Sequence, residues 1–194
     1  MKIKKSLITK SILSILVFAL LFNFILAQNG NVGRSQKQNL NYKHSIDTSP
    51  ISPLIDIYGI HYNYHFTDQD ELIVGLGYMR IGYDFGNTNS VALIVGYRRY
   101  LWEKLHIEYQ LWPSYDEFYE SNEDKYYPSY DLWNEFRLGY QFDFKLFEMP
   151  FYASIQWPFG FGLYASNKPE SFKEHEEENR FFYHVPLIFL GYRF

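Results

Sequence analysis

The sequence has no cysteine among its 194 residues. This absence excludes disulfide bridges, zinc–thiolate sites, a cysteine nucleophile and a lipidated N-terminal cysteine. Long apolar runs are also nearly absent, because the only one lies within the first 27 residues. The length leaves room for one domain and little more.

The single apolar run has the features of a targeting segment. Residues 11–26 are apolar apart from a few small or polar positions, and Ala27 offers a cleavage site before Gln28. A positively charged stretch precedes this core, as in secretory signal peptides. Its basic residues are Lys2, Lys4, Lys5 and Lys10. We therefore expect residues 1–27 to be a cleaved signal peptide, and an uncleaved anchor helix is the alternative.

Positive charge is scarce once this segment is removed. The full chain has a formal charge of −4, and the loss of four lysines and no acids lowers it to −8. An acidic chain of this kind argues against nucleic acid as a partner. Aromatic residues, in contrast, make up 21% of the sequence, with 19 Tyr and 18 Phe. That content excludes a disordered chain and is typical of strands and of membrane interfaces.

Beyond a polar segment at 28–38, apolar and polar residues alternate with a period of two, which predicts strands. Seven such segments are bounded by polar or turn-forming residues. They are 54–66, 71–85, 91–102, 105–119, 130–144, 150–164 and 180–194. A weaker alternation at 40–46 is a candidate for an eighth strand. The sequence leaves open whether residues 39–46 form it.

The two faces of these strands differ sharply in polarity. One face is almost wholly apolar and aromatic, and the other carries His, Glu, Gln, Asp, Arg, Asn and Gly. A soluble barrel would have to enclose most of the large aromatic side chains, which is too much volume for eight strands. Short and long connections also alternate, as in outer-membrane barrels. We therefore predict an all-β fold, an eight-stranded antiparallel up-and-down transmembrane β-barrel over residues 39–194.

The alternating strands and the terminal Tyr192-Arg193-Phe194 resemble the small outer-membrane β-barrels of the OmpA/OmpX-like superfamily. The resemblance implies an outer-membrane location in a diderm bacterium and contact with lipid and lipopolysaccharide. It also implies that Tyr192 and Phe194 form an assembly signal read by the barrel-assembly machinery. Members of this superfamily serve as structural, adhesive or host-contact proteins, and a few modify lipid A. We expect a monomer.

Register arithmetic predicts a network of charges inside the barrel. A tight turn after Trp102 places Arg98 opposite Glu108, and the next hairpin places Glu108 near Arg137. Glu135 lies two residues further along on the same face. Charges in a narrow, dry lumen need partners, so we expect these four side chains to plug the barrel.

The sequence offers little for catalysis or metal binding. His61 and His65 share a face but lie about 13 Å apart in an extended strand, too far for one metal ion. No His-x-Ser motif of the lipid A deacylase type is present, and His184 and Ser154 are only loose candidates. We therefore expect a non-enzymatic protein without metal or cofactor. A lipid A-modifying enzyme and a very small pore remain the alternatives.

Overall fold

The computed structural model describes residues 42–102, 104–183 and 186–194 of the chain. Within these ranges the protein is almost entirely antiparallel β-structure in one sheet of eleven strands. The expected signal peptide at 1–27 and the polar segment at 28–38 lie outside the described residues. The same holds for residues 39–41 of the expected barrel.

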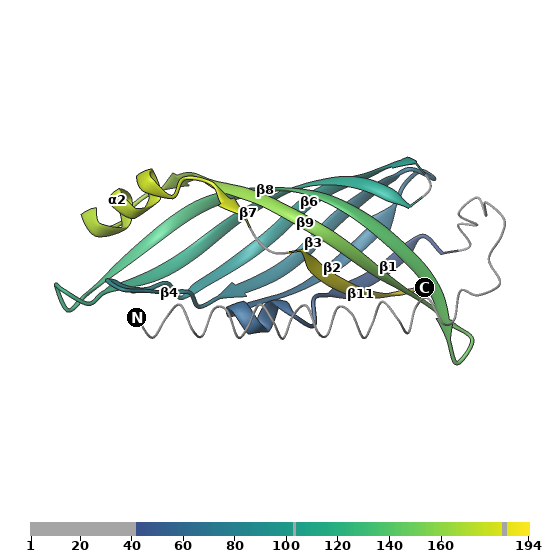
Figure 1. The fold of residues 1–194 in the computed structure, drawn as a ribbon, viewed down its shortest axis with the longest axis horizontal. Coiled ribbons are helices and arrows are strands. Elements are labelled where there is room, and N and C mark those ends of the chain that lie inside the picture. The colour runs from purple at the N-terminus through teal and green to yellow at the C-terminus, as the bar shows by residue number, and fades with distance from the viewer. Residues whose placement is uncertain (1–41, 103, 184–185) are drawn as a thin grey trace. The chain divides into compact units, whose positions relative to one another are not determined.

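The elements follow one another along the chain as successive hairpins (Figure 1). The strands are β1 (His44–Thr48), β2 (Ile57–His65), β3 (Asp70–Met79), β4 (Gly82–Tyr83), β5 (Gly86–Asn87), β6 (Ser90–Trp102), β7 (Leu105–Glu120), β8 (Lys125–Leu146), β9 (Met149–Ala165), β10 (Phe182–Tyr183) and β11 (Leu187–Arg193). A short 3₁₀ helix, η1 (Ser52–Ile55), precedes β2, and one α-helix, α2 (Glu170–Glu178), follows β9.

Eight of the strands close into a ring. The order β1-β2-β3-β6-β7-β8-β9-β11 returns to β1, and each neighbouring pair is antiparallel. Ile46 closes the ring, because it pairs with Tyr62 on β2 and with Tyr192 on β11. Closure leaves the ring without a free edge strand.

The first strand exists, but its predicted position is shifted. The alternation predicted residues 40–46, whereas β1 begins at His44 and ends at Thr48. It extends further because Asp47 turns into the interior and accepts three side-chain hydrogen bonds there. The predicted faces are confirmed, since Ser45 is buried and Ile46 is exposed.

Polar residues point into the ring and apolar residues point out of it. On β6, Ser90, Ala92, Ile94 and Arg98 are buried. The intervening side chains of this strand are exposed, and they are Val91, Leu93, Val95 and Tyr97. Arg98 is fully buried, whereas Leu76 on the neighbouring β3 is 61% exposed. This is the reverse of the polarity of a soluble protein.

The sequence suggested a polar interior, but part of the interior is apolar. Ala92, Ile94 and Trp112 form a buried apolar cluster, with Met79 and Trp133 packed against it. Trp112 lies on the inward face because its position on β7 alternates with outward Leu111. Its indole Nε1 donates to Gln110 Oε1 over 2.8 Å, which joins the apolar layer to the polar one.

The connections at the two ends of the barrel differ in length. At one end the β8–β9 turn has only Phe147 and Glu148, with φ values of 50° and 63°, as a two-residue hairpin turn requires. The other end holds β4, β5, the β7–β8 turn and α2 (Figure 1). The alternation of short and long connections is thus as predicted.

The connection left between the predicted strands 150–164 and 180–194 is not irregular throughout, because α2 occupies most of it. Phe172 anchors this helix, with its ring 5.1 Å from that of Phe118 and 5.7 Å from that of Tyr83. Such tertiary contacts hold a helix of nine residues that is too short to be stable alone. In the described part of the chain, no helix has the length and apolarity needed to cross a bilayer.

Candidate functional site: the polar network inside the barrel

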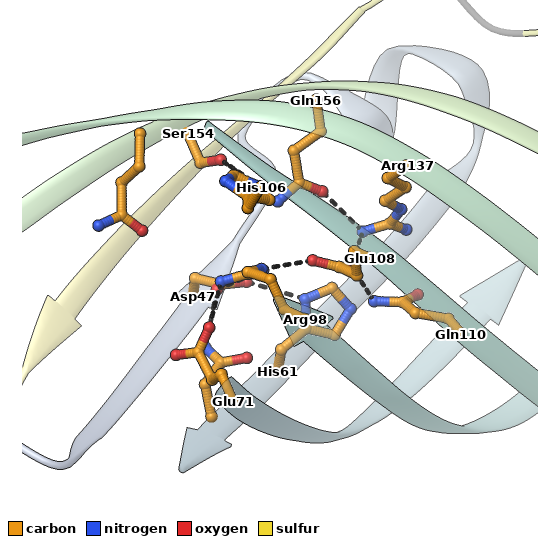
Figure 2. Close-up of polar contacts among 12 residues, drawn as sticks. Asp47, His61, Glu71, Arg98, His106, Glu108, Gln110, Arg137, Ser154 and Gln156 are labelled. Carbon is orange, nitrogen blue, oxygen red and sulfur yellow. Dashed lines mark hydrogen bonds and ion pairs between the residues drawn. The ribbon is translucent and has the colours of Figure 1, made fainter. Parts of the chain in front are cut away.

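Arg98 lies at the centre of the polar interior (Figure 2). Its Nε donates to Glu108 Oε2 over 2.6 Å, and its NH1 donates to Glu71 Oε2 over 2.7 Å. Both contacts follow from sheet register, because Arg98 on β6 is paired with Glu71 on β3 and with Glu108 on β7. Its NH2 lies 3.9 Å from Asp47 Oδ2 across the lumen. One guanidinium therefore faces three carboxylates.

Arg137 on β8 continues the network. Its NH1 donates to Glu108 Oε1 over 3.2 Å and to Gln156 Oε1 over 3.1 Å, while its Nε donates to Glu135. The guanidinium also lies over the ring of Phe189, 4.9 Å from its centroid. The structure thus brings the four residues predicted from register into one continuous chain. Glu108 bridges the two arginines, with one oxygen on each.

Asp47 belongs to the network but was not predicted from the sequence. Its carboxylate accepts hydrogen bonds of 2.8 Å each from His61, Asn63 and the hydroxyl of Tyr152. Tyr152 lies on β9, more than one hundred positions away, and the two meet only because β1 closes the ring. The available signal was the alternation of β1, which puts Asp47 on the inward face with Ser45.

Glu71 was also missed, because the connection between β3 and β6 contains β4 and β5 and does not fix their register. It begins the inward face of β3, directly opposite Arg98. Its Oε1 lies 3.0 Å from Nε2 of His65, whose ring stacks on Tyr100. His61 and His65 therefore contact different carboxylates, Asp47 and Glu71. Among the described residues no group of three or more potential ligands could hold a metal ion.

Carboxylates outnumber guanidiniums in this network. Four carboxylates face two guanidiniums, which leaves two negative charges. The carboxylates belong to Asp47, Glu71, Glu108 and Glu135. The imidazoles of His61 and His65 lie 2.8 Å and 3.0 Å from carboxylate oxygens of Asp47 and Glu71. Buried charges that lack such partners would cost several kcal/mol each, roughly.

Ser154, one of the two residues considered for catalysis, lies beside His106 in the lumen. Ser154 Oγ lies 3.5 Å from Nε2 of His106, and both side chains are fully buried. The ring of His106 packs so closely on Gly139 that an added Cβ would lie 2.3 Å from Nε2. His184, the other residue considered, lies outside the described residues.

A second ion cluster holds the segment before α2 on the barrel rim. Lys168 Nζ donates to Asp116 of β7 and lies 2.8 Å from Asp131 Oδ2 of β8. The ammonium also sits over the ring of Phe172, 4.8 Å from its centroid. Ser171 adds a hydrogen bond to Glu120. These contacts fix α2 over one end of the ring.

The residues of the predicted assembly signal lie at the opposite end, on the outer face. The ring of Tyr192 lies 5.3 Å from that of Phe151 and 6.1 Å from that of Phe194. Phe194 is 49% exposed and stacks on His44. Both aromatic side chains are therefore accessible from outside the barrel.

Comparison with protein-family models, curated proteins and solved structures finds no match to this chain. The resemblance to the OmpA/OmpX-like superfamily therefore stays an interpretation of the strand pattern and the terminal residues.

Proposed function

We propose that the protein is a non-enzymatic integral outer-membrane β-barrel with a structural or surface-contact role and a lumen sealed by polar side chains. The observation that carries this proposal is the reversed polarity of the ring. Ile60, Leu76 and Leu138 are each more than half exposed, while Arg98, Glu108 and Gln110 are buried. A bilayer is the solvent that favours such an arrangement.

Aromatic side chains at both ends support a membrane position. Trp102 and Phe147, at the end with short turns, are 74% and 86% exposed. Tyr126, Tyr130 and Tyr164, toward the end with α2, are each more than 60% exposed. Rings at the ends of strands are typical of the two interfaces of a bilayer. In this proposal residues 1–27 direct export, and Tyr192 and Phe194 are read by the barrel-assembly machinery.

The surface-contact role follows from the different connections at the two ends of the barrel. The end with α2 carries the longer, acidic connections and would face outward, with lipopolysaccharide around it, while the short turns would face the periplasm. The buried ion pairs of Glu108 with Arg98 and Arg137 line the lumen, and Arg98 also reaches toward Asp47 on β1, which favours a sealed barrel over a pore.

Fractionation and gel migration test this proposal together. The full chain, expressed in a diderm bacterium, should be recovered in the outer membrane and should require detergent for extraction. The extracted protein should migrate faster on a gel before heating than after it, as compact barrels do. Recovery as a soluble periplasmic protein would refute the proposal.

Two further measurements address the alternatives. Planar-bilayer recording should show no steady conductance, and steady single-channel currents would instead support a small pore. Mass spectrometry of lipid A with and without expression should show the same acyl chains, and the loss or gain of one would support an enzyme.

A further inference from the structure

A cavity of about 160 Å³ lies between α2 and the adjoining end of the barrel. Residues from strands on several sides of the ring line it, and α2 contributes Phe172 and Glu176. Its apolar wall includes Met79, Trp112, Leu132, Trp133, Phe172 and Leu187. A mainly apolar pocket with a few converging polar groups is the usual form of a small-molecule site.

Ser90 supplies an unpaired polar group in this cavity. Its side chain is only 3% exposed, and its hydroxyl has no hydrogen-bond partner within the described residues. A buried hydroxyl left unpaired costs about 1–3 kcal/mol, so most such groups in proteins have a partner. Ser90 lines the cavity, which makes a bound molecule a suitable partner.

The charges around the cavity favour a cation. Four carboxylates and two basic groups line it, for a net charge of −2. The acidic residues are Asp116, Asp131, Glu135 and Glu176, and the basic ones are Lys168 and Arg137. Both basic groups are already engaged, Lys168 by Asp116 and Asp131 and Arg137 by Glu135.

Glu176 is the acid left for a ligand. In the described part of the chain its carboxylate has no hydrogen bond or close ion pair, although Lys168, Arg180 and His175 act on it at longer range. Its Oε1 lies over Gly162, where a Cβ would come within 2.2 Å. The missing side chain at Gly162 therefore leaves the space in which this carboxylate turns toward the barrel.

We propose that this cavity binds a small organic cation, a primary amine carried on one aromatic ring or on a branched alkyl group of similar size. A cavity of about 150 Å³ accommodates a benzene ring, which sets the size. The ring would pack on Trp112 and Trp133, whose faces also attract cations. Glu176 would be the counter-ion, and the hydroxyl of Ser90 offers a further polar partner in the same cavity.

Three phenylalkyl probes of similar size and different charge test the inference. They are 2-phenylethylamine, 2-phenylethanol and 3-phenylpropionate, titrated calorimetrically into the folded full chain in detergent. We expect saturable binding of the amine, at least about fivefold weaker binding of the alcohol, and no binding of the carboxylate. Equal binding of all three, or no saturable binding of the amine at about 10 mM, would overturn the proposal.

Matched variants on α2 assign the counter-ion. Glu176→Gln should weaken binding of the amine by about tenfold and leave the alcohol unchanged, because only the charge is lost. Glu174→Gln, on the exposed side of the same helix, should change neither. If the two variants weakened binding of the amine equally, the assignment of Glu176 as counter-ion would be contradicted.

Folding of each variant is checked by its gel migration before and after heating.

This inference goes beyond the proposed function, which assigns no ligand. Its readout is binding by folded protein in micelles, so it does not depend on which membrane the barrel occupies.

Discussion

Arg98 and Glu108 stand directly opposite each other on β6 and β7, and the Nε of Arg98 donates to Oε2 of Glu108 over 2.6 Å. The other oxygen of Glu108 accepts from Arg137. One carboxylate thus holds two buried guanidiniums that would otherwise repel each other.

The first prediction concerns this bridge. Glu108→Gln should lower the free energy of unfolding by about 3–5 kcal/mol, because two buried cations lose their shared counter-ion. The measurement is urea unfolding in micelles, followed by tryptophan fluorescence. Glu117→Gln on the exposed face of the same strand is the control and should change stability by less than about 0.5 kcal/mol. Similar losses in the two variants would show that the bridge is not stabilising.

The second prediction concerns ring closure. Tyr152→Phe removes the hydroxyl that donates to Asp47 Oδ2 and should cost about 1–3 kcal/mol, since Asp47 is buried. Tyr164→Phe, at a residue that is 61% exposed, serves as its match and should have almost no effect. If both variants unfold at the same urea concentration, the hydrogen bond across the closing strands contributes nothing.

The third prediction concerns a close approach inside the lumen. A Cβ at Gly191 would lie 2.1 Å from Cζ of the Tyr152 ring, so Gly191→Ala should force that ring to move and destabilise the barrel by about 1–3 kcal/mol. Gly82→Ala meets no atom within 4 Å and should be tolerated. The two variants are compared by the temperature at which each loses the fast-migrating band that the folded protein gives on a gel. Tolerance of both would mean that β9 and β11 are packed less closely than described.

The fourth prediction is a pH dependence of α2. Burial, together with the carboxylate of Asp131, raises the pKa of the Glu176 carboxyl above its ordinary value of 4.5, and Lys168, Arg180 and His175 lower it in part. The docked state therefore binds a proton more tightly than the detached state. Docking should be strongest below pH 4.5 and should weaken as the pH rises through the raised pKa.

Hydrogen exchange of the α2 amides measures this effect. Protection, corrected for the intrinsic pH dependence of exchange, should fall as the pH rises, and the fall should be smaller in Glu176→Gln. The variant isolates the contribution of Glu176. Protection in the native chain that does not change with pH would contradict the prediction.

Local patterns predicted the parts of the fold that depend on neighbouring residues. Alternation with a period of two places Val91, Leu93 and Val95 outside and Arg98 inside, and hairpin counting places Arg98 opposite Glu108. Both follow because consecutive antiparallel strands fix their own register. Glu71 was not found in this way, because β4 and β5 lie in the connection between β3 and β6 and leave that register open.

The remaining contacts depend on strands that are distant in the sequence. Asp47 and Tyr152 meet only through the pairing of β1 with β11 and of β11 with β9, which no turn length determines. Helix α2 escaped prediction because its acidic sequence looks solvated, and its stability comes from the contacts of Phe172 with Phe118 and Tyr83. Tertiary packing overrides local propensity at this site.

The central claim is that the apolar face of the ring meets lipid. Because the chain has no cysteine, single cysteines introduced at Leu76, Leu138 and Glu123 can each carry a spin label without background. In reconstituted bilayers the account predicts that labels at Leu76 and Leu138 are relaxed strongly by oxygen and weakly by a water-soluble nickel complex, with the reverse at Glu123. Strong relaxation by the nickel complex at Leu76 and Leu138 would contradict it.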